Sequence, residues 1–216
     1  MKKLTLQKAT CGYGKKEILP QVSLSINAGD LCLIKGENGS GKTTLGLSLL
    51  GLLPLIKGER KSTFKNAAYV PQANQLDKQY PIQIQTLVAM GRGSYSQLNF
   101  IKSIFHRKTY KEQLYAILKH FNLYEKRHHR FREASGGELQ RALIARAIIS
   151  NPDVILLDEP FANIDQNGRN MIKEILKEEH KKNKTTLVII DHHNNIDFYT
   201  KKIHVSEGEV QIHESD

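Results

Sequence analysis

The sequence is poor in several features that mark particular classes of protein. Only two of its 216 residues are cysteine, Cys11 and Cys32, and it has no tryptophan. Two cysteines are too few for a disulfide framework, so a reducing compartment is expected. No segment approaches the roughly 18 uncharged apolar residues that span a bilayer. Residues 1–7 alternate like a strand and lack the apolar stretch of a signal peptide. We therefore expect a soluble, cytoplasmic protein.

Acidic residues are also scarce relative to basic ones, with 22 Asp and Glu against 32 Lys and Arg, a net charge of +10. The imbalance is largest between Lys102 and Arg132, where nine basic residues face only Glu112 and Glu125. Such a segment could bind nucleic acid or an anionic membrane surface. It could equally form solvated helix faces. Few aromatic residues lie among these charges, which gives base stacking little support.

A glycine-rich segment follows the apolar run 31–34 and precedes a helix-like segment that begins at Thr44. The segment reads Gly36-Glu37-Asn38-Gly39-Ser40-Gly41-Lys42-Thr43. A strand, a glycine-rich turn and a helix are the context that a phosphate-binding loop requires. Backbone N–H groups and the helix N-terminus can hold phosphates, Lys42 can reach the β and γ phosphates, and Thr43 can ligate Mg²⁺. We expect this segment, with Thr44, to bind a nucleoside triphosphate rather than to form an ordinary surface turn.

A pair of carboxylates ends a second apolar run, at residues 154–157. Asp158 at the end of a buried strand suits the Mg²⁺ carboxylate of a Walker B motif. Glu159 could polarise the attacking water as a general base. Acidic residues often end strands for no catalytic reason, but the phosphate loop favours the catalytic interpretation.

A second helix start lies upstream, where Ser135 and Glu138 form a Ser-x-x-Glu capping box ahead of an amphipathic segment. Gly136 and Gly137 leave the N–H groups of the first helical turn open to an anion. Elsewhere, the pattern predicts strands at 3–10, 22–27, 31–35, 67–71, 154–157 and 187–190, helices from about 82 to 150, and a closing hairpin at Glu207-Gly208.

Together, the phosphate loop, the Ser135–Glu138 segment and the pair Asp158-Glu159 resemble the ATP-binding cassette (ABC) ATPases, and the match covers essentially the whole chain. The resemblance implies an α/β fold with a P-loop NTPase (RecA-like) core, an N-terminal antiparallel β region and an inserted helical subdomain. It implies a single ABC ATPase domain over residues 1–216. The nucleotide-binding core would comprise 1–75 and 151–216, and the helical subdomain 76–150.

The resemblance also assigns roles to residues that would attract little attention alone. Tyr13 falls where the family has an aromatic ring that stacks on adenine. Gln72 matches the Q-loop glutamine, which contacts Mg²⁺ and links the nucleotide site to the helical subdomain. Asp165 takes the acidic position of the D-loop, and His192 matches the switch histidine that contacts the γ-phosphate. ATP and Mg²⁺ are therefore the expected cofactors, with Thr43, Gln72 and Asp158 around the metal.

The family signature is usually Leu-Ser-Gly-Gly-Gln, whereas this chain reads Ala134-Ser135-Gly136-Gly137-Glu138. The Ser-Gly-Gly that contacts phosphate is kept, so activity is expected to be retained. The resemblance implies a head-to-tail homodimer, in which Ser135, Gly136 and Gly137 of one copy close over the ATP bound by the other.

A finer resemblance concerns the segments between Tyr69 and Arg92, and Phe161, which look like those of the ATPases of zinc, manganese and chelated-iron importers. It implies a peripheral subunit on the inner face of the cell membrane, bound to membrane permeases. An extracytoplasmic substrate-binding protein would act indirectly. The histidines, including His128-His129, lack partners at metal-ligand spacing, so the transported ion is not expected to bind this chain.

Two other functions are open. The charge of +10 suits a nucleic-acid-associated ABC ATPase, but only 63 positions separate Gln72 from Ser135, which leaves no room for a long coiled coil. There is also a single phosphate loop, so a transporter subunit is favoured and no nucleic-acid partner is expected. A non-hydrolysing regulatory cassette is disfavoured by the presence of Glu159 and His192.

Overall fold

The structure is a computed structural model that describes residues 2–73, 76–77, 79–92, 100–162, 164–192, 196–206 and 208–214. For residues 100–108 it describes the backbone alone. The strands are β1 (Lys3–Tyr13), β2 (Lys16–Asn27), β3 (Leu31–Lys35), β4 (Lys57–Ser62), β5 (Ala67–Val70), β6 (Val154–Asp158), β7 (Thr186–Ile190), β8 (Lys201–Ser206) and β9 (Glu209–Glu214). The α-helices are α1 (Lys42–Leu50), α2 (Ile84–Ala89), α3 (Phe100–His120), α4 (Gly136–Ile148) and α5 (Gln166–Asn183).

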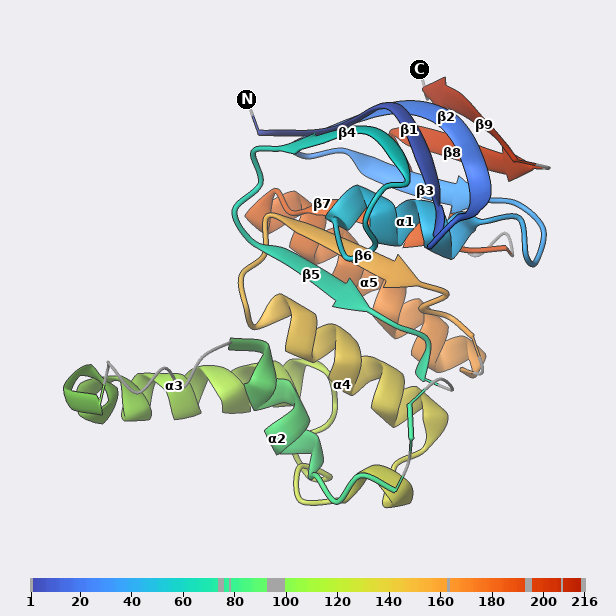
Figure 1. The fold of residues 1–216 in the computed structure, drawn as a ribbon. Coiled ribbons are helices and arrows are strands. Elements are labelled where there is room, and N and C mark those ends of the chain that lie inside the picture. Colours follow the sequence, from blue (N-terminus) through green and yellow to red (C-terminus); the bar gives the residue numbers. More distant parts are fainter. Residues whose placement is uncertain are drawn as a thin grey trace.

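The larger sheet has the strand order β5-β6-β7-β3-β8-β9, and all of its pairings are parallel except that of β8 with β9 (Figure 1). Every residue of β6 and β7 is buried, as expected for strands covered on both faces. The smaller sheet, β2-β1-β4, is antiparallel. The predicted α/β fold with an N-terminal antiparallel region is therefore confirmed.

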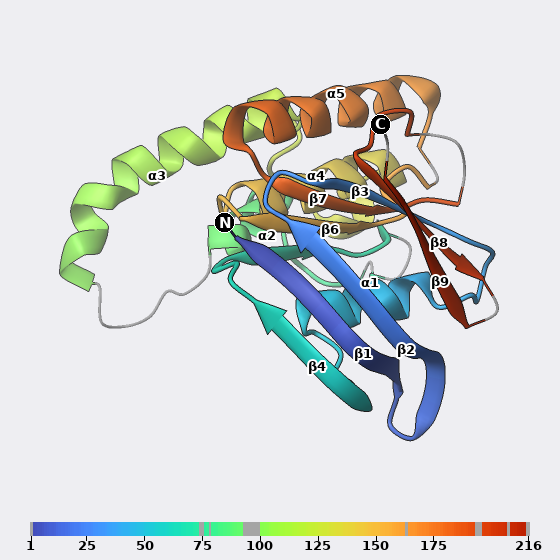
Figure 2. The same cartoon turned by 90° about the horizontal axis from the view of Figure 1, so that it is seen from above.

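Two hydrophobic cores lie on opposite faces of the larger sheet, because alternate side chains of a strand point to opposite sides. Val154 and Leu156 of β6 pack in one core with α1 and the smaller sheet. Ile155 and Leu157 of the same strand pack in the other core with α4 and α5. Figures 1 and 2 show the same separation, with α1 beneath the smaller sheet and α4 across β5 and β6. The sheet therefore stands between α1 and α4.

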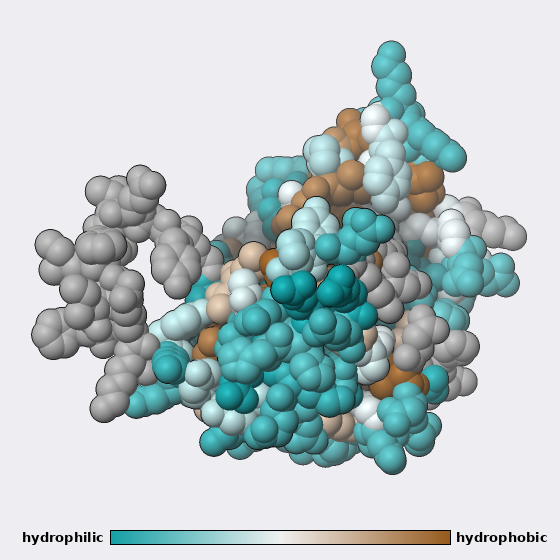
Figure 3. Space-filling view, turned by 90° about the horizontal axis from the view of Figure 1, so that it is seen from below, coloured by the Kyte–Doolittle hydropathy of each residue, from teal (hydrophilic) through white to brown (hydrophobic). Residues whose placement is uncertain are grey.

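The helical part, α2, α3 and α4, forms the lower end of the molecule in Figure 1, where α2 contacts α3 and α4. Its surface is mostly hydrophilic when seen from below (Figure 3). Within the described ranges, every helix is too short or too polar to cross a membrane.

The predicted strands are present, although β1 continues to Tyr13 and β2 begins earlier than expected, at Lys16. The reason is a two-residue turn in which Gly14 takes a φ of 58°. The expectation of helices throughout 82–150 is wrong for residues 121–135, which form turns and a short 3₁₀ segment. Helix α3 ends where Asn122 adopts a left-handed φ of 51°, a conformation that Asn tolerates.

Candidate functional site

Four neighbouring parallel strands bring the sequence-predicted residues to one edge of the larger sheet. β3 continues into the phosphate loop, β5 leads to Gln72, β6 ends in Asp158, and β7 leads to His192. In parallel sheets the carboxyl ends of the strands share one edge, and ligands bind there. Segments far apart in the sequence thus meet around the phosphate loop.

The phosphate loop disfavours side chains at two of its glycines, one because of close packing and the other because of its backbone conformation. A Cβ at Gly36 would lie 2.0 Å from the Val205 carbonyl oxygen, and Gly41, the N-cap of α1, has a φ of 101°. The Lys42 Nζ donates to the carbonyls of Gly36 (3.0 Å) and Glu37 (2.6 Å). Burial lowers the pKa of Lys42, while the charges of Glu159 and Asp158 oppose that shift. The lysine therefore lies over the loop, beside two carboxylates.

The remaining loop residues differ in exposure. Glu37, Asn38 and Gly39 are exposed at the tip, whereas Thr44 is buried in the first turn of α1. The Ser40 hydroxyl is buried and has no hydrogen-bond partner among the described residues. A buried unpaired hydroxyl is costly, and a ligand that formed a hydrogen bond with this atom would remove that cost.

Asp158 is held by two hydroxyl groups on the same oxygen. Its Oδ2 accepts from Thr43 Oγ1 at 2.9 Å and, at the limit of bonding distance, from Tyr69 Oη at 3.5 Å. Its Oδ1 is buried and has no partner within the described chain. Burial, and then the charge of Glu159, raises the pKa of Asp158, although the Thr43 hydrogen bond lowers it. A buried carboxylate oxygen without a donor, beside a threonine hydroxyl, fits the oxygen ligands that Mg²⁺ prefers.

Glu159 and His192 form a pair next to Asp158. His192 Nδ1 lies 3.0 Å from Glu159 Oε1. Glu159 has a φ of 47°, a conformation that non-glycine residues rarely adopt, and its N–H donates to the Ile190 carbonyl at 3.0 Å. Unusual backbone geometry of this kind is concentrated at functional sites. The structure therefore turns the Glu159 carboxylate towards the histidine that follows the neighbouring strand.

Side chains of α4 hold the loop around Gln72 at both ends, a feature the sequence analysis did not anticipate. The Ala73 N–H donates to Gln140 Oε1 at 3.2 Å, and Arg146 Nη2 donates to the Tyr69 carbonyl at 3.3 Å. Gln140 is buried. The only sequence signal for these residues was their position in the amphipathic helix after Ser135, which does not show what they contact.

The signature residues belong to a different part of the molecule from the phosphate loop. Ser135 caps α4, accepting from the Glu138 N–H at 3.2 Å, and the predicted capping box is confirmed. Gly136 and Gly137 follow in the first turn, on the face of the sheet opposite α1. The structure therefore does not bring these three residues into the phosphate-binding loop of their own chain.

Two further predicted residues lie outside the central group. Tyr13 ends β1 and is 51% exposed, so its ring is available to a ligand. Asp165 is the N-cap of α5, and its Oδ1 accepts from the Gly168 N–H at 3.0 Å. Their roles towards a nucleotide remain predictions. Asn163, in the same loop as Asp165, His193, next to His192, and the basic residues within 102–108 lie outside the residues whose side chains are described.

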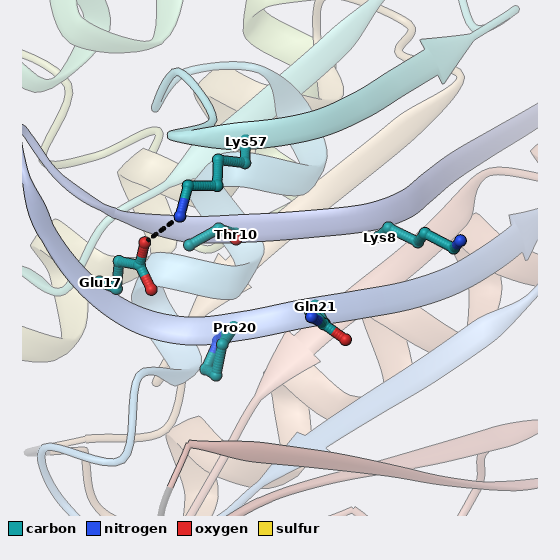
Figure 4. A pocket seen from close by; sticks show the side chains of 6 residues that line it. All are labelled: Lys8, Thr10, Glu17, Pro20, Gln21 and Lys57. Carbon is teal, nitrogen blue, oxygen red and sulfur yellow. Dashed lines mark hydrogen bonds and ion pairs between the residues drawn. The ribbon is translucent and has the colours of Figure 1, made fainter.

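A hollow of about 280 Å³ lies on the smaller sheet, lined by residues of β1, β2 and β4 (Figure 4). Lys57 and Glu17 form an ion pair across it at 2.9 Å. None of the predicted site residues lines this hollow, so it is separate from the phosphate loop. Within the described ranges, no three His, Cys, Asp or Glu side chains come together as a metal site.

A comparison of the sequence with models of known protein families identifies the family to which the chain belongs. The model of the ABC transporter family matches residues 19–162, which span the phosphate loop, the signature segment and Asp158-Glu159. The chain belongs to the ABC transporter family, and it is an ATPase that binds ATP.

Individual relatives within this family are ATP-binding proteins of transport systems. The chain is 34% identical to the manganese transport system ATP-binding protein MntB of Listeria innocua, over 88% of this chain and 80% of that protein. It is 32% identical to the phosphonates import ATP-binding protein PhnC of Fusobacterium nucleatum, over 92% of each. Two solved structures, each 25% identical with a TM-score of 0.81, share the fold. One is a metal-chelate type ABC transporter in an inward-facing conformation, covering 99% of this chain and 84% of the other. The second is the dimeric bacterial cassette MJ0796, covering 98% of both chains.

Proposed function

We propose that this chain is the nucleotide-binding subunit of an importer of a transition-metal ion, zinc, manganese or iron. It would bind, as a homodimer, to permease subunits at the inner face of the cell membrane. ATP hydrolysis by this chain is supported by one observation above all: at one edge of the sheet the structure brings together Lys42, Asp158, Glu159 and His192. The metal part is supported by the segments between Tyr69 and Arg92 and by the metal-transport relatives.

In the proposed mechanism, the phosphate loop and the N-terminus of α1 hold the ATP phosphates, with Lys42 turning from the loop carbonyls to the β and γ phosphates. Thr43, Asp158 and Gln72 would hold Mg²⁺, which supplies charge neutralisation on the phosphates. Glu159 would accept a proton from the attacking water, and His192, which lies 3.0 Å from Glu159, would steady the γ-phosphate.

The signature residues complete the site from a second copy. Ser135, Gly136 and Gly137 lie across the sheet from α1, so they are poorly placed for the ATP of their own chain. In a head-to-tail dimer they would face the partner's ATP, and the dimeric state of a cassette with the same fold supports the pairing of two copies. Hydrolysis would reopen the pair, and the permeases would convert that motion into import. The loop at Gln72, held by α4, is the proposed link to the helical part.

Deletion of the gene tests the transported substrate. The deletion strain should contain less zinc, manganese or iron, and the correct ion in excess should restore its growth. Complementation with the wild-type gene should restore the metal content, whereas complementation with Glu159→Gln should not. Unchanged levels of all three metals would reject the metal part. Altered DNA repair or translation would favour the nucleic-acid alternative, and loss of phosphonate uptake would indicate a different importer.

Calorimetry tests the expectation that the transported ion does not bind this chain. The nucleotide-free protein should show only weak binding of Zn²⁺ or Mn²⁺ by surface histidines. A stoichiometric, tight site abolished by His192→Ala or His128→Ala would contradict this part of the proposal.

A further inference from the structure

The first turn of α4 carries a buried carboxylate beside the proposed phosphate contact. The Glu138 side chain is 8% exposed. Its Oε2 accepts from the Ser135 N–H at 3.0 Å, and its own N–H donates to Ser135 Oγ at 3.2 Å. Its Oε1 pairs with the ammonium group of Lys126. Both carboxylate oxygens are therefore engaged.

This cap leaves the Ser135 hydroxyl hydrogen available to a ligand. A serine hydroxyl has one hydrogen to donate, and here its oxygen is the acceptor of the capping bond. Ser135 is exposed, and the N-terminus of α4 follows it. A helix N-terminus favours anions, but a negative charge in its first turn opposes the approach of a polyphosphate. Glu138 therefore stabilises the cap of α4, but its negative charge repels the phosphate that Ser135 is proposed to contact.

Two cations face this carboxylate. Burial by itself would raise the pKa of Glu138, but hydrogen bonds from Lys126 and the Ser135 backbone, with the charges of Lys126 and Arg141, lower it. Arg141 is also engaged elsewhere, because its Nε donates to the Phe121 carbonyl at 3.1 Å. Lys126 lies in the turns between α3 and α4 with 48% of its side chain exposed. Of the two, Lys126 is the one in direct contact with the carboxylate.

We propose that Lys126 is a positioning residue for ATP bound to a second copy of this chain: it neutralises Glu138 and holds it in the cap, so that Ser135 can meet the γ-phosphate. This inference rests on the shared active site proposed above. It also explains how the chain accommodates Glu138 where the signature usually has an uncharged glutamine. A glutamine keeps the capping bond without the charge, whereas a glutamate adds a negative charge that the ammonium group of Lys126 offsets.

Four proteins test the pair in a double-mutant cycle: wild type, Lys126→Met, Glu138→Gln and the double variant. Lys126→Met should raise the KM for ATP roughly tenfold or more, because an uncompensated carboxylate repels the triphosphate. The kcat at saturating ATP should fall much less. With Glu138→Gln already present, Lys126→Met should change KM by less than about twofold. Lys119→Met, which removes an exposed lysine that lies over the Tyr124 ring, controls for the loss of one positive charge.

ATP-dependent dimerisation gives a second measurement, made by sedimentation of the same variants carrying Glu159→Gln. Lys126→Met should weaken the ATP-bound dimer when Glu138 is present and not when Gln replaces it. Thermal unfolding of each variant separates a folding defect from this effect. A folding defect would lower the unfolding temperature of the nucleotide-free protein, whereas a weaker ATP-bound dimer alone would not.

Equal effects of Lys126→Met in the presence of Glu138 and of Gln would overturn the proposal, as would an unchanged KM. A Ser135→Arg chain separates this failure from that of the shared site. If Ser135→Arg is inactive while Lys126→Met behaves as wild type, only the role of Lys126 is wrong. If Ser135→Arg hydrolyses ATP at the wild-type rate, the shared site is wrong, and the role of Lys126 with it.

Discussion

At the scale of single residues, the two adjacent carboxylates at the end of β6 have different surroundings. Asp158 is 1% exposed and accepts hydrogen bonds from Thr43 and Tyr69, with one oxygen left over. Glu159 is turned by its left-handed backbone towards His192. This difference suits two tasks, because one carboxylate is fixed beside the threonine hydroxyl and the other, paired with His192, can exchange a proton.

Glu159→Gln should preserve ATP binding and slow hydrolysis by about 10²-fold or more, because an amide cannot accept the proton of the attacking water. An ATP-bound dimer should accumulate. Steady-state turnover and nucleotide-binding measurements check this outcome. Glu174→Gln, on the exposed side of α5, is the matched control and should retain activity. Near-normal turnover of Glu159→Gln would remove Glu159 from the role of general base.

Tyr13→Ala should weaken ATP binding roughly 5- to 100-fold, since stacking of a base on an aromatic ring is worth ~1–3 kcal/mol. The ring is half exposed at the end of β1, as a stacking platform must be. Tyr13→Phe keeps the ring and should bind ATP nearly as the wild type does. ATP and GTP should be discriminated only slightly, because every base has a π-face. An unchanged affinity of Tyr13→Ala would show that the ring only packs.

At the scale of elements, connections between strands are fixed by buried or half-buried polar groups. Asp153, just before β6, accepts from the N–H groups of Lys65 at 2.7 Å and Asn66 at 3.2 Å and also pairs with Lys2. Burial alone would raise its pKa, but these partners lower it below the usual value of 3.8. Asp153 therefore joins the segment before β5 to the segment before β6, and these two strands lead to Gln72 and Asp158.

Asp153→Asn should lower the free energy of unfolding by about 1–2 kcal/mol at neutral pH, because charge-assisted hydrogen bonds are lost. A lowered pKa stabilises the folded protein above the usual value of 3.8, and this stabilisation is lost as the pH falls through the folded-state pKa. The gap between variant and wild type should thus be constant from about pH 8 to pH 5 and narrow below about pH 4. Urea unfolding at several pH values measures the gap. The exposed Asp197→Asn should show little effect, and a gap that widens on acidification would contradict the assignment.

At the scale of the whole molecule, the larger sheet separates the phosphate loop from the signature turn. α1 and α4 pack on opposite faces of β6, in different cores. A single chain therefore carries the phosphate loop and the signature turn in different places, and the proposed head-to-tail pair would bring them together. Such an arrangement would couple nucleotide binding to the association of two copies.

Mixing Lys42→Ala and Ser135→Arg chains should restore ATPase activity that neither variant has alone. Each heterodimer would hold one intact site, made of Lys42 from one chain and Ser135 from the other. With random pairing, half of the dimers are mixed and each has one of two sites, so about a quarter of the wild-type rate is expected. Steady-state turnover against mixing ratio gives the measurement. Wild-type activity in either homodimer would show that the active site is not shared.

The sequence by itself determined the features that depend on neighbours along the chain. Glycines at fixed spacing predicted the turn between β3 and α1, unbroken apolar runs predicted the buried strands β6 and β7, and Ser135 with Glu138 predicted the start of α4. These features follow from local hydrogen bonding and hydrophobic periodicity, which act over a few residues. The class of protein followed from the resemblance of these motifs to those of the ABC ATPases.

Tertiary structure alone decided which distant residues meet. The contacts of Tyr69 with Asp158, of Gln140 with Ala73 and of Lys126 with Glu138 join separate elements, and no local pattern predicts them. They depend on the strand order of the sheet and on which of its faces each helix covers. The same packing separates the signature turn from the phosphate loop, because side chains of a strand alternate between two cores. A sequence motif indicates which ligand one segment can bind, whereas the strand order of the sheet determines which segments meet at the same ligand.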